Sequence, residues 1–156
     1  MNQFNKPNPG FGGNRGGFQD RPPPVAIDPS PIKLTAPLSP QLFSEMAEKF
    51  AEQIANGKKE QNKPTQIRKF YDELVMWHDR TWTGEPAERE KRYQEHAPFI
   101  RMLTAKVAYA EGRGHVDKNF QTLFNHCIRA IDSADTLRNC KLFIEAFMGF
   151  YKAYKN

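Results

Sequence analysis

Prolines and glycines are concentrated at one end of the chain, and this asymmetry limits where a folded domain can form. Nine of the twelve prolines lie in residues 1–40, and five of the ten glycines lie in residues 1–20. Such a segment buries too little apolar surface to offset the entropy that is lost on ordering. The sequence therefore predicts two parts, a disordered low-complexity tail over residues 1–38 and a folded domain over residues 39–156.

The tail itself combines two compositions. The stretch PNPGFGGNRGGF is similar to the Arg-Gly-Gly segments of RNA-associated proteins, in which Arg and Phe stack on bases, and RPPPVAIDPSPIKLTAPLSP has the composition of a stiff linker. Two roles stay open for it. It adds weak, non-specific RNA affinity through Arg15, Arg21 and the phenylalanines, or it is an inert solubilising extension.

From Ser39 onward the apolar residues recur at helical spacing, and no alternation typical of strands is present. Ser39 and Pro40 predict an N-cap and a first helical position, and Gly57 predicts the end of that helix. Further helices are expected over about residues 65–81, over 85–111 with an interruption at Ala97-Pro98, around 120–131, and from about Asp135. The pattern predicts an all-α fold, a compact bundle of five to six helices.

Composition excludes several classes. No apolar run approaches the roughly 20 residues needed to cross a bilayer, and the N-terminus has no apolar signal region. Two cysteines cannot form a disulfide framework, so we expect a reduced, cytoplasmic protein. A net charge of +5 favours an anionic partner without identifying one.

No motif indicates catalysis or metal binding. The sequence lacks a phosphate-binding glycine loop, a nucleophile elbow and a zinc-protease helix. Cys127 and Cys140 fall on apolar helical faces, which predicts buried free thiols. A zinc site would lack two ligands, because His126 points about 100° away from Cys127 on a helix. We therefore expect no enzyme, no metal and no cofactor.

The basic residues allow two interpretations. Arg68, Lys69 and Lys141 each have an acidic residue four positions later, which predicts surface ion pairs. Lys106 has no acidic residue three or four positions away on either side. Arg113 stands where a helix should end, and there a cation complements the helix dipole. Phosphate binding and simple ion pairing both stay open for this set.

Three segments occur in an order that resembles a known family: TQIRKFYDEL (65–74), PFIRMLTAKVAYAEGR (98–113) and LFIEAFMGFYKAY (142–154). Together they resemble the small helical subunit of type III-A CRISPR–Cas effector complexes, the Csm small subunit, over about residues 64–155. The N-terminal tail departs from the family pattern. The resemblance implies a five- or six-helix bundle without catalytic activity. Copies would stack into a short filament beside the backbone and large subunits, along guide RNA paired to target RNA.

The resemblance also implies contacts to sugar and phosphate, with sequence read by guide–target pairing. The main RNA-binding candidates match the basic positions of the family, and a second group is weaker. The main candidates are Arg68, Lys69, Lys106 and Arg113, and the weaker ones are Lys63, Arg101, Lys141 and Lys152. Tyr71 and Tyr109 are expected in the core because of their helical spacing. Two alternatives remain, a free-standing single-stranded RNA-binding protein and a protein-only helical adaptor.

Overall fold

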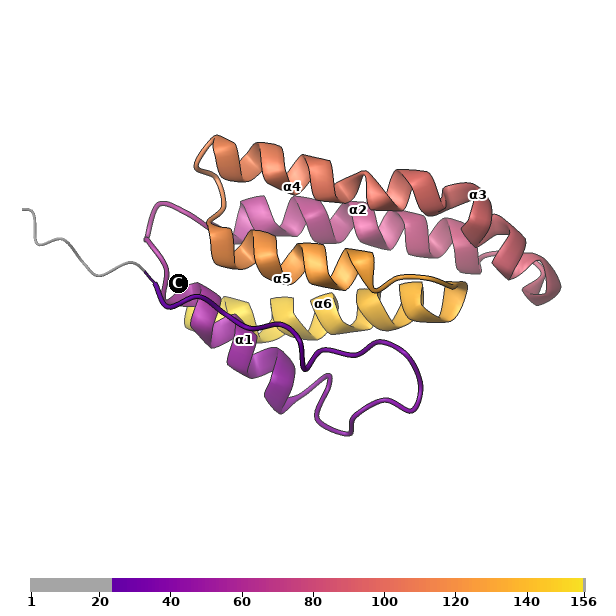
Figure 1. Cartoon of the computed structure of the whole chain (residues 1–156), viewed down its shortest axis with the longest axis horizontal. Coiled ribbons are helices and arrows are strands. Elements are labelled where there is room, and N and C mark those ends of the chain that lie inside the picture. The colour runs from indigo at the N-terminus through magenta and orange to yellow at the C-terminus, as the bar shows by residue number, and fades with distance from the viewer. Residues whose placement is uncertain (1–23, 156) are drawn as a thin grey trace, which may run out of the picture.

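The structure is a computed structural model that describes residues 24–155, and these residues form a bundle of helices (Figure 1). The elements in chain order are α1 Glu45–Ala55, α2 Pro64–Trp82, the short 3-10 helix η1 Pro86–Glu88, α3 Arg89–Arg101, α4 Leu103–Gly112, α5 Lys118–Arg129 and α6 Ala134–Tyr154. No strand occurs within residues 24–155. The predicted all-α bundle is confirmed, while the Gly/Arg/Phe part of the tail, residues 1–23, lies outside the described residues.

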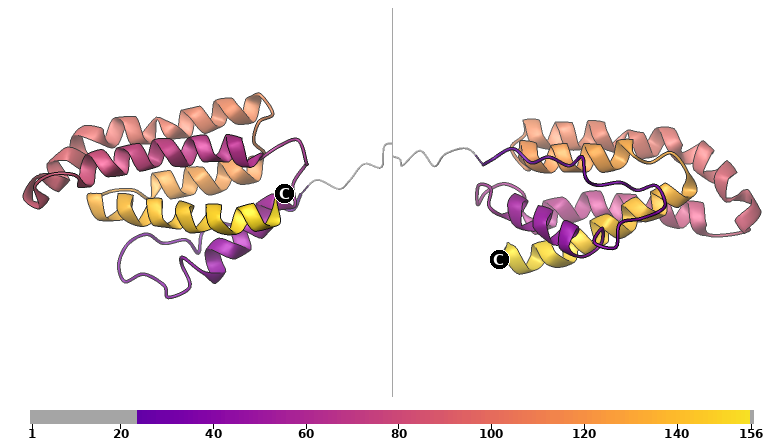
Figure 2. Two further views of the ribbon diagram at one scale, coloured as in Figure 1. Left: turned by 180° about the vertical axis from the view of Figure 1, so that it is seen from behind. Right: turned by 60° about the horizontal axis from the view of Figure 1, so that its bottom comes forward.

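Helix α2 runs along one broad face of the bundle, between α4 and α6. The view from behind in Figure 2 shows this face, with α4 above α2 and α6 below it. Helix α1 packs on α6, α6 also packs on α2, and α5 packs on α4. The face is therefore built from three helices that are far apart in the sequence.

The core is rich in phenylalanine and is centred on α5 and α6. The rings of Phe120 and Phe124 stack at 5.6 Å between centroids, and Phe70 of α2 meets both of them. Cys127 and Cys140 are fully buried free thiols, as expected, and burial raises the pKa of Cys127 to about 12. A deep core of this kind fixes the three helices of the outer face in position.

Residues 24–38, here called the strap, pack on the bundle. Ile27, Ile32 and Leu34 are buried in the core cluster. The Ile27 N–H donates to Asn119 Oδ1 at 3.1 Å, and Asn119 Nδ2 donates to the Val25 carbonyl at 3.0 Å. Two further side chains hydrogen-bond carbonyl groups of the strap. His126 Nε2 of α5 bonds the Ile32 carbonyl oxygen at 2.8 Å, and Asn139 Nδ2 of α6 donates to the Leu34 carbonyl oxygen at 2.8 Å.

This differs from the expected tail boundary at residue 38. Composition shows that a proline-rich segment cannot form its own helix or sheet. It does not show that side chains elsewhere can satisfy the backbone polar groups of such a segment. The strap is ordered by three aliphatic side chains and by the amides of two distant helices, so the packed part of the chain begins before Ser39.

Two helix boundaries also differ from the expected ones. Ser39 and Pro40 begin a series of turns instead of a helix, and α1 starts only at Glu45. Pro98 lies inside α3 on its exposed side, and the interruption comes at Met102. On that side, water can bond the carbonyl that proline leaves free, so the helix continues for another turn.

Gly57 does follow the end of α1, as predicted, but its role is a close approach. A Cβ atom at Gly57 would lie 2.7 Å from Asp117 Oδ2. Asp117 in turn caps α5, because its Oδ1 accepts from the Phe120 N–H at 2.9 Å. Glycine here lets the end of α1 pack against the start of α5.

Candidate nucleic-acid interface

Two grooves flank α2 on the face formed by α4, α2 and α6. The α2–α4 groove has a volume of about 300 Å³ and the α2–α6 groove about 570 Å³. Arg68 and Lys69 are consecutive on α2, so their side chains leave the helix about 100° apart. Arg68 consequently lines the α2–α6 groove and Lys69 lines the α2–α4 groove.

The α2–α4 groove collects three of the four main RNA-binding candidates. Lys69 comes from α2, and Lys106 and Arg113 come from α4 and its C-terminal end. Lys106 and Arg113 are seven residues apart, and this spacing places them on the same side of α4. Glu73 is the one carboxylate among the lining residues of this groove.

Glu73 pairs differently from the sequence expectation. Its carboxylate binds Lys106 Nζ across the groove, whereas the expected partner was Lys69, four residues before it on the same helix. Within residues 24–155, Lys69 forms no ion pair. The i+4 rule failed here because α4 brings a lysine from a distant segment to the same carboxylate. Lys69 is therefore the more available cation of the two.

Tyr109 and Phe70 both line this groove, but only Tyr109 is exposed, and the expectation that Tyr109 lies in the core is wrong. Its side chain is 67% exposed. Helix α4 buries Leu103, Val107 and Ala110, and Tyr109 falls on the flank of this line, beside Lys106. The line of buried residues, read off a helical projection, could have excluded Tyr109 from the core.

Arg113 holds the Tyr109 ring from one end. Its Nη1 donates to Tyr109 Oη at 3.0 Å, and its guanidinium carbon lies 5.7 Å from the ring centroid. An arginine side chain has five N–H donors. Arg113 can therefore orient the ring and still offer donors to another acceptor in the groove.

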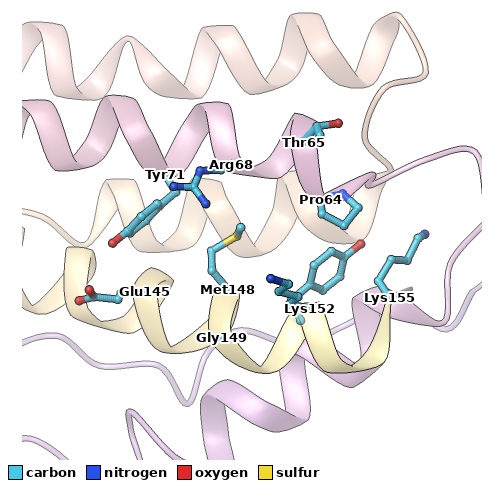
Figure 3. Close-up of a pocket in the computed structure, with 10 residues that line it drawn as sticks. Pro64, Thr65, Arg68, Tyr71, Glu145, Met148, Gly149, Lys152 and Lys155 are labelled. Atoms are coloured by element: carbon cyan, nitrogen blue, oxygen red, sulfur yellow. The ribbon is translucent and has the colours of Figure 1, made fainter.

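The α2–α6 groove is lined by Arg68 on one side and Lys152 on the other, with the side chain of Met148 between α2 and α6 (Figure 3). Arg68 meets Asp72 at 3.7 Å, and both side chains are well exposed, as an i,i+4 surface pair should be. Tyr71 also lines the groove and is partly buried against the core. Its pKa is raised, mainly because the side chain is partly buried and also because the negative charge of Glu145 lies nearby.

Lys155 lines the same groove, although sequence reasoning did not select it. Its Nζ donates to the carbonyls of Lys58 (3.1 Å) and Gln61 (2.8 Å), and burial lowers its pKa. These bonds tie the end of α6 to the loop before α2. Lys155 therefore acts as a structural anchor, and Lys152 is the freer cation of the groove.

The remaining candidates lie outside the lining of both grooves. Lys141 pairs with Glu145 at 3.0 Å, as its spacing predicted, and is largely buried. Lys63 is the exposed N-cap residue of α2, next to Pro64, which lines the α2–α6 groove. Arg101 ends α3 and is exposed. The structure therefore brings together five of the eight candidates.

Three lining residues of the α2–α4 groove were missed by sequence reasoning. They are Gln66, Glu73 as a cross-groove partner, and His115. No local signal could have selected them, because their proximity depends on how α2 and α4 pack. Within residues 24–155, no three His, Cys, Asp or Glu side chains are grouped as metal ligands would be, and no helix has the length and apolarity needed to span a membrane.

The comparisons with known proteins give one match. The family model described as Csm2 Type III-A matches residues 38–156. No curated protein and no solved structure matches the chain. The family match covers helices α1 to α6 and both grooves, and it starts at the end of the strap. The chain belongs to the Csm2 family, and is thus a small subunit of type III-A CRISPR effector complexes.

Proposed function

We propose that this subunit binds the sugar-phosphate backbone of guide RNA paired to target RNA through the face formed by α4, α2 and α6. Lys69, Lys106 and Arg113 would contact phosphates in the α2–α4 groove, and Arg68 and Lys152 would do so in the α2–α6 groove. The observation that carries the proposal is that three cations converge on one narrow groove with a single carboxylate. Phosphate neutralisation by such cations makes binding depend on salt.

The arrangement favours backbone contact over base recognition of a duplex. The lysines and arginines lie in two grooves on either side of α2, so they can contact successive phosphates of an RNA backbone that crosses this face. The deep, narrow major groove of an RNA duplex keeps side chains away from its base edges. Sequence would then be read by guide–target pairing, and the subunit would not be catalytic.

Assembly is the second part of the proposal. Copies of the subunit would stack in a filament beside the backbone and large subunits, in the cytoplasm. Support comes from Phe99 and Met102, which are 51% and 48% exposed at the junction of α3 and α4, where Phe99 stacks on Trp77 at 5.5 Å. Apolar side chains exposed side by side are typical of protein contacts. Neither residue lines a groove described above, so RNA and a protein could bind at once.

Charge reversal tests the RNA-binding proposal. The full-length Lys69→Glu/Lys106→Glu protein should bind RNA more weakly, and the slope of log K against log salt should fall by about 1 to 2. Arg101→Glu is the matched control, since Arg101 is exposed and lines neither groove. An equal loss per reversed residue in the two variants would indicate a general charge effect and contradict the assignment to the groove.

The two alternatives make different predictions. A free-standing RNA-binding protein that uses its tail would lose RNA affinity when residues 1–23 are removed and would keep it in the charge-reversed protein. A protein-only adaptor would show no salt-dependent RNA binding at all. The convergence of Lys69, Lys106 and Arg113 on one groove favours the effector subunit over both.

A further inference from the structure

The side chain that stands out in the α2–α4 groove is an exposed tyrosine among cations. Tyr109 is 67% exposed, more than any other aromatic side chain in the described part of the chain. Lys106 and Arg113 lie three residues before it and four residues after it on the same side of α4, and Lys69 faces them from α2. The core does not use this ring, and ion pairing does not explain it.

We propose that Tyr109 is a stacking platform for an unpaired RNA base, while Lys69, Lys106 and Arg113 hold the adjacent phosphates. This inference rests on the proposed function and extends it, since it names a single-stranded or unpaired nucleotide as the occupant of the α2–α4 groove. The bases inside an intact duplex are already stacked on each other. Only an unpaired base offers a free face to the ring.

The ring is held in place before RNA arrives. The hydrogen bond from Arg113 Nη1 to Tyr109 Oη restrains the side chain from its hydroxyl end and leaves much of the ring exposed. Restraint of this kind lowers the entropy lost on binding. The guanidinium keeps further donors for a phosphate, so one arginine serves both the ring and the backbone.

The groove also has the chemistry of a polynucleotide site more than of a protein site. Its lining carries three cations against one carboxylate, together with the polar side chains Gln66 and His115, and its apolar part is Phe70 and Ala110 beside Tyr109. A volume of about 300 Å³ suits a single planar group beside the backbone. Charge complementarity therefore selects a polyanion, and the exposed ring selects one with free aromatic faces.

The test uses the full-length protein, a short single-stranded RNA carrying 2-aminopurine, and a blunt RNA duplex of the same sequence. With the wild-type protein, stacking should quench the fluorescence of the 2-aminopurine in the single strand. Tyr109→Ala should weaken single-strand binding by about tenfold or more and abolish the quenching. Duplex binding should change by less than about twofold.

Two variants serve as controls. Tyr109→Phe keeps the ring and should keep the quenching. Tyr154→Ala removes another exposed tyrosine, 42% exposed on α6, which bonds Glu48 and lies outside both grooves; its RNA binding should stay unchanged. Single-strand binding by Tyr109→Ala at the wild-type level would overturn the inference. If Lys69→Glu/Lys106→Glu binds both RNAs as well as the wild type does, the proposed function itself fails.

Discussion

Glu73 on α2 and Lys106 on α4 form an ion pair across the α2–α4 groove. The Glu73 carboxylate therefore neutralises Lys106, one of the three cations that the proposed RNA contact requires. In a narrow groove a carboxylate also repels a phosphate directly. When RNA binds, a phosphate should either replace the Glu73 carboxylate as the partner of Lys106 or share Lys106 with it.

Glu73→Gln should strengthen RNA binding. The amide removes the repulsion and frees Lys106, so we expect affinity to rise by about two- to tenfold at low salt and the gain to shrink at high salt. Fluorescence anisotropy with labelled RNA measures the effect. Glu52→Gln on α1 makes the same charge change on another helix and should have little effect. Weaker binding by Glu73→Gln would mean that the ion pair builds the site.

The strap should contribute to stability, whereas residues 1–23 should not. Removal of residues 1–38 takes away the buried side chains of Ile27, Ile32 and Leu34 and exposes the core beneath them. The burial of each side chain contributes about 1.5–3 kcal/mol to stability, and the conformational entropy lost on ordering the strap offsets part of this gain. We expect Tm to fall by about 10 °C or more. The chain lacking only residues 1–23 should melt like the full chain. Identical melting of all three chains would show that the strap does not support the bundle.

Asn119 offers a point test of the same segment. Its side chain bonds the Ile27 N–H and the Val25 carbonyl, so Asn119→Ala leaves a buried N–H without a partner. The expected cost is about 1–3 kcal/mol of unfolding free energy, measured by urea denaturation. A loss below about 0.5 kcal/mol would mean that water replaces the amide at no cost.

Gly57→Ala should destabilise the fold. The new Cβ would lie 2.7 Å from Asp117 Oδ2, so the cap of α5 must shift. We expect a loss of about 1–2 kcal/mol in urea denaturation. Gly149→Ala is the control, because its Cβ meets nothing within 4 Å and α6 should gain up to about 1 kcal/mol. Equal effects of the two variants would contradict the close approach.

Buried acidic groups predict lower stability in alkali. Burial raises the pKa of Cys127 from 9.0 to about 12 and that of Cys140 well above 9.0. Burial, with Asp117, raises the pKa of Tyr151 as well. The unfolded chain loses these protons first, so the free energy of unfolding should fall as pH rises from about 9 towards 12.

Urea denaturation at several pH values measures this slope. The Cys127→Ala/Cys140→Ala protein should be less stable at neutral pH because of the cavities it creates, yet it should lose stability less steeply above about pH 9. An unchanged slope would show that the thiols do not account for it.

Much of the fold could be predicted from the sequence because helical spacing is a local property. The apolar lines of α2, α5 and α6 mark their own buried faces. The strap could not be predicted in this way, because its hydrogen-bond partners Asn119 and Asn139 lie 94 and 105 residues further along the chain. The Glu73–Lys106 ion pair could not be predicted either, because it joins two helices whose packing the local sequence does not specify. Tyr109 was misassigned although the line formed by Leu103, Val107 and Ala110 was already visible in the sequence.

The proposed function requires that this chain binds RNA inside a type III-A effector complex. The most direct measurement is to recover the tagged full-length protein from its own cells and sequence the RNA that accompanies it. We expect short RNAs with a shared repeat-derived end, together with several other proteins. Mixed cellular RNA without those proteins, or no RNA above background, would contradict it.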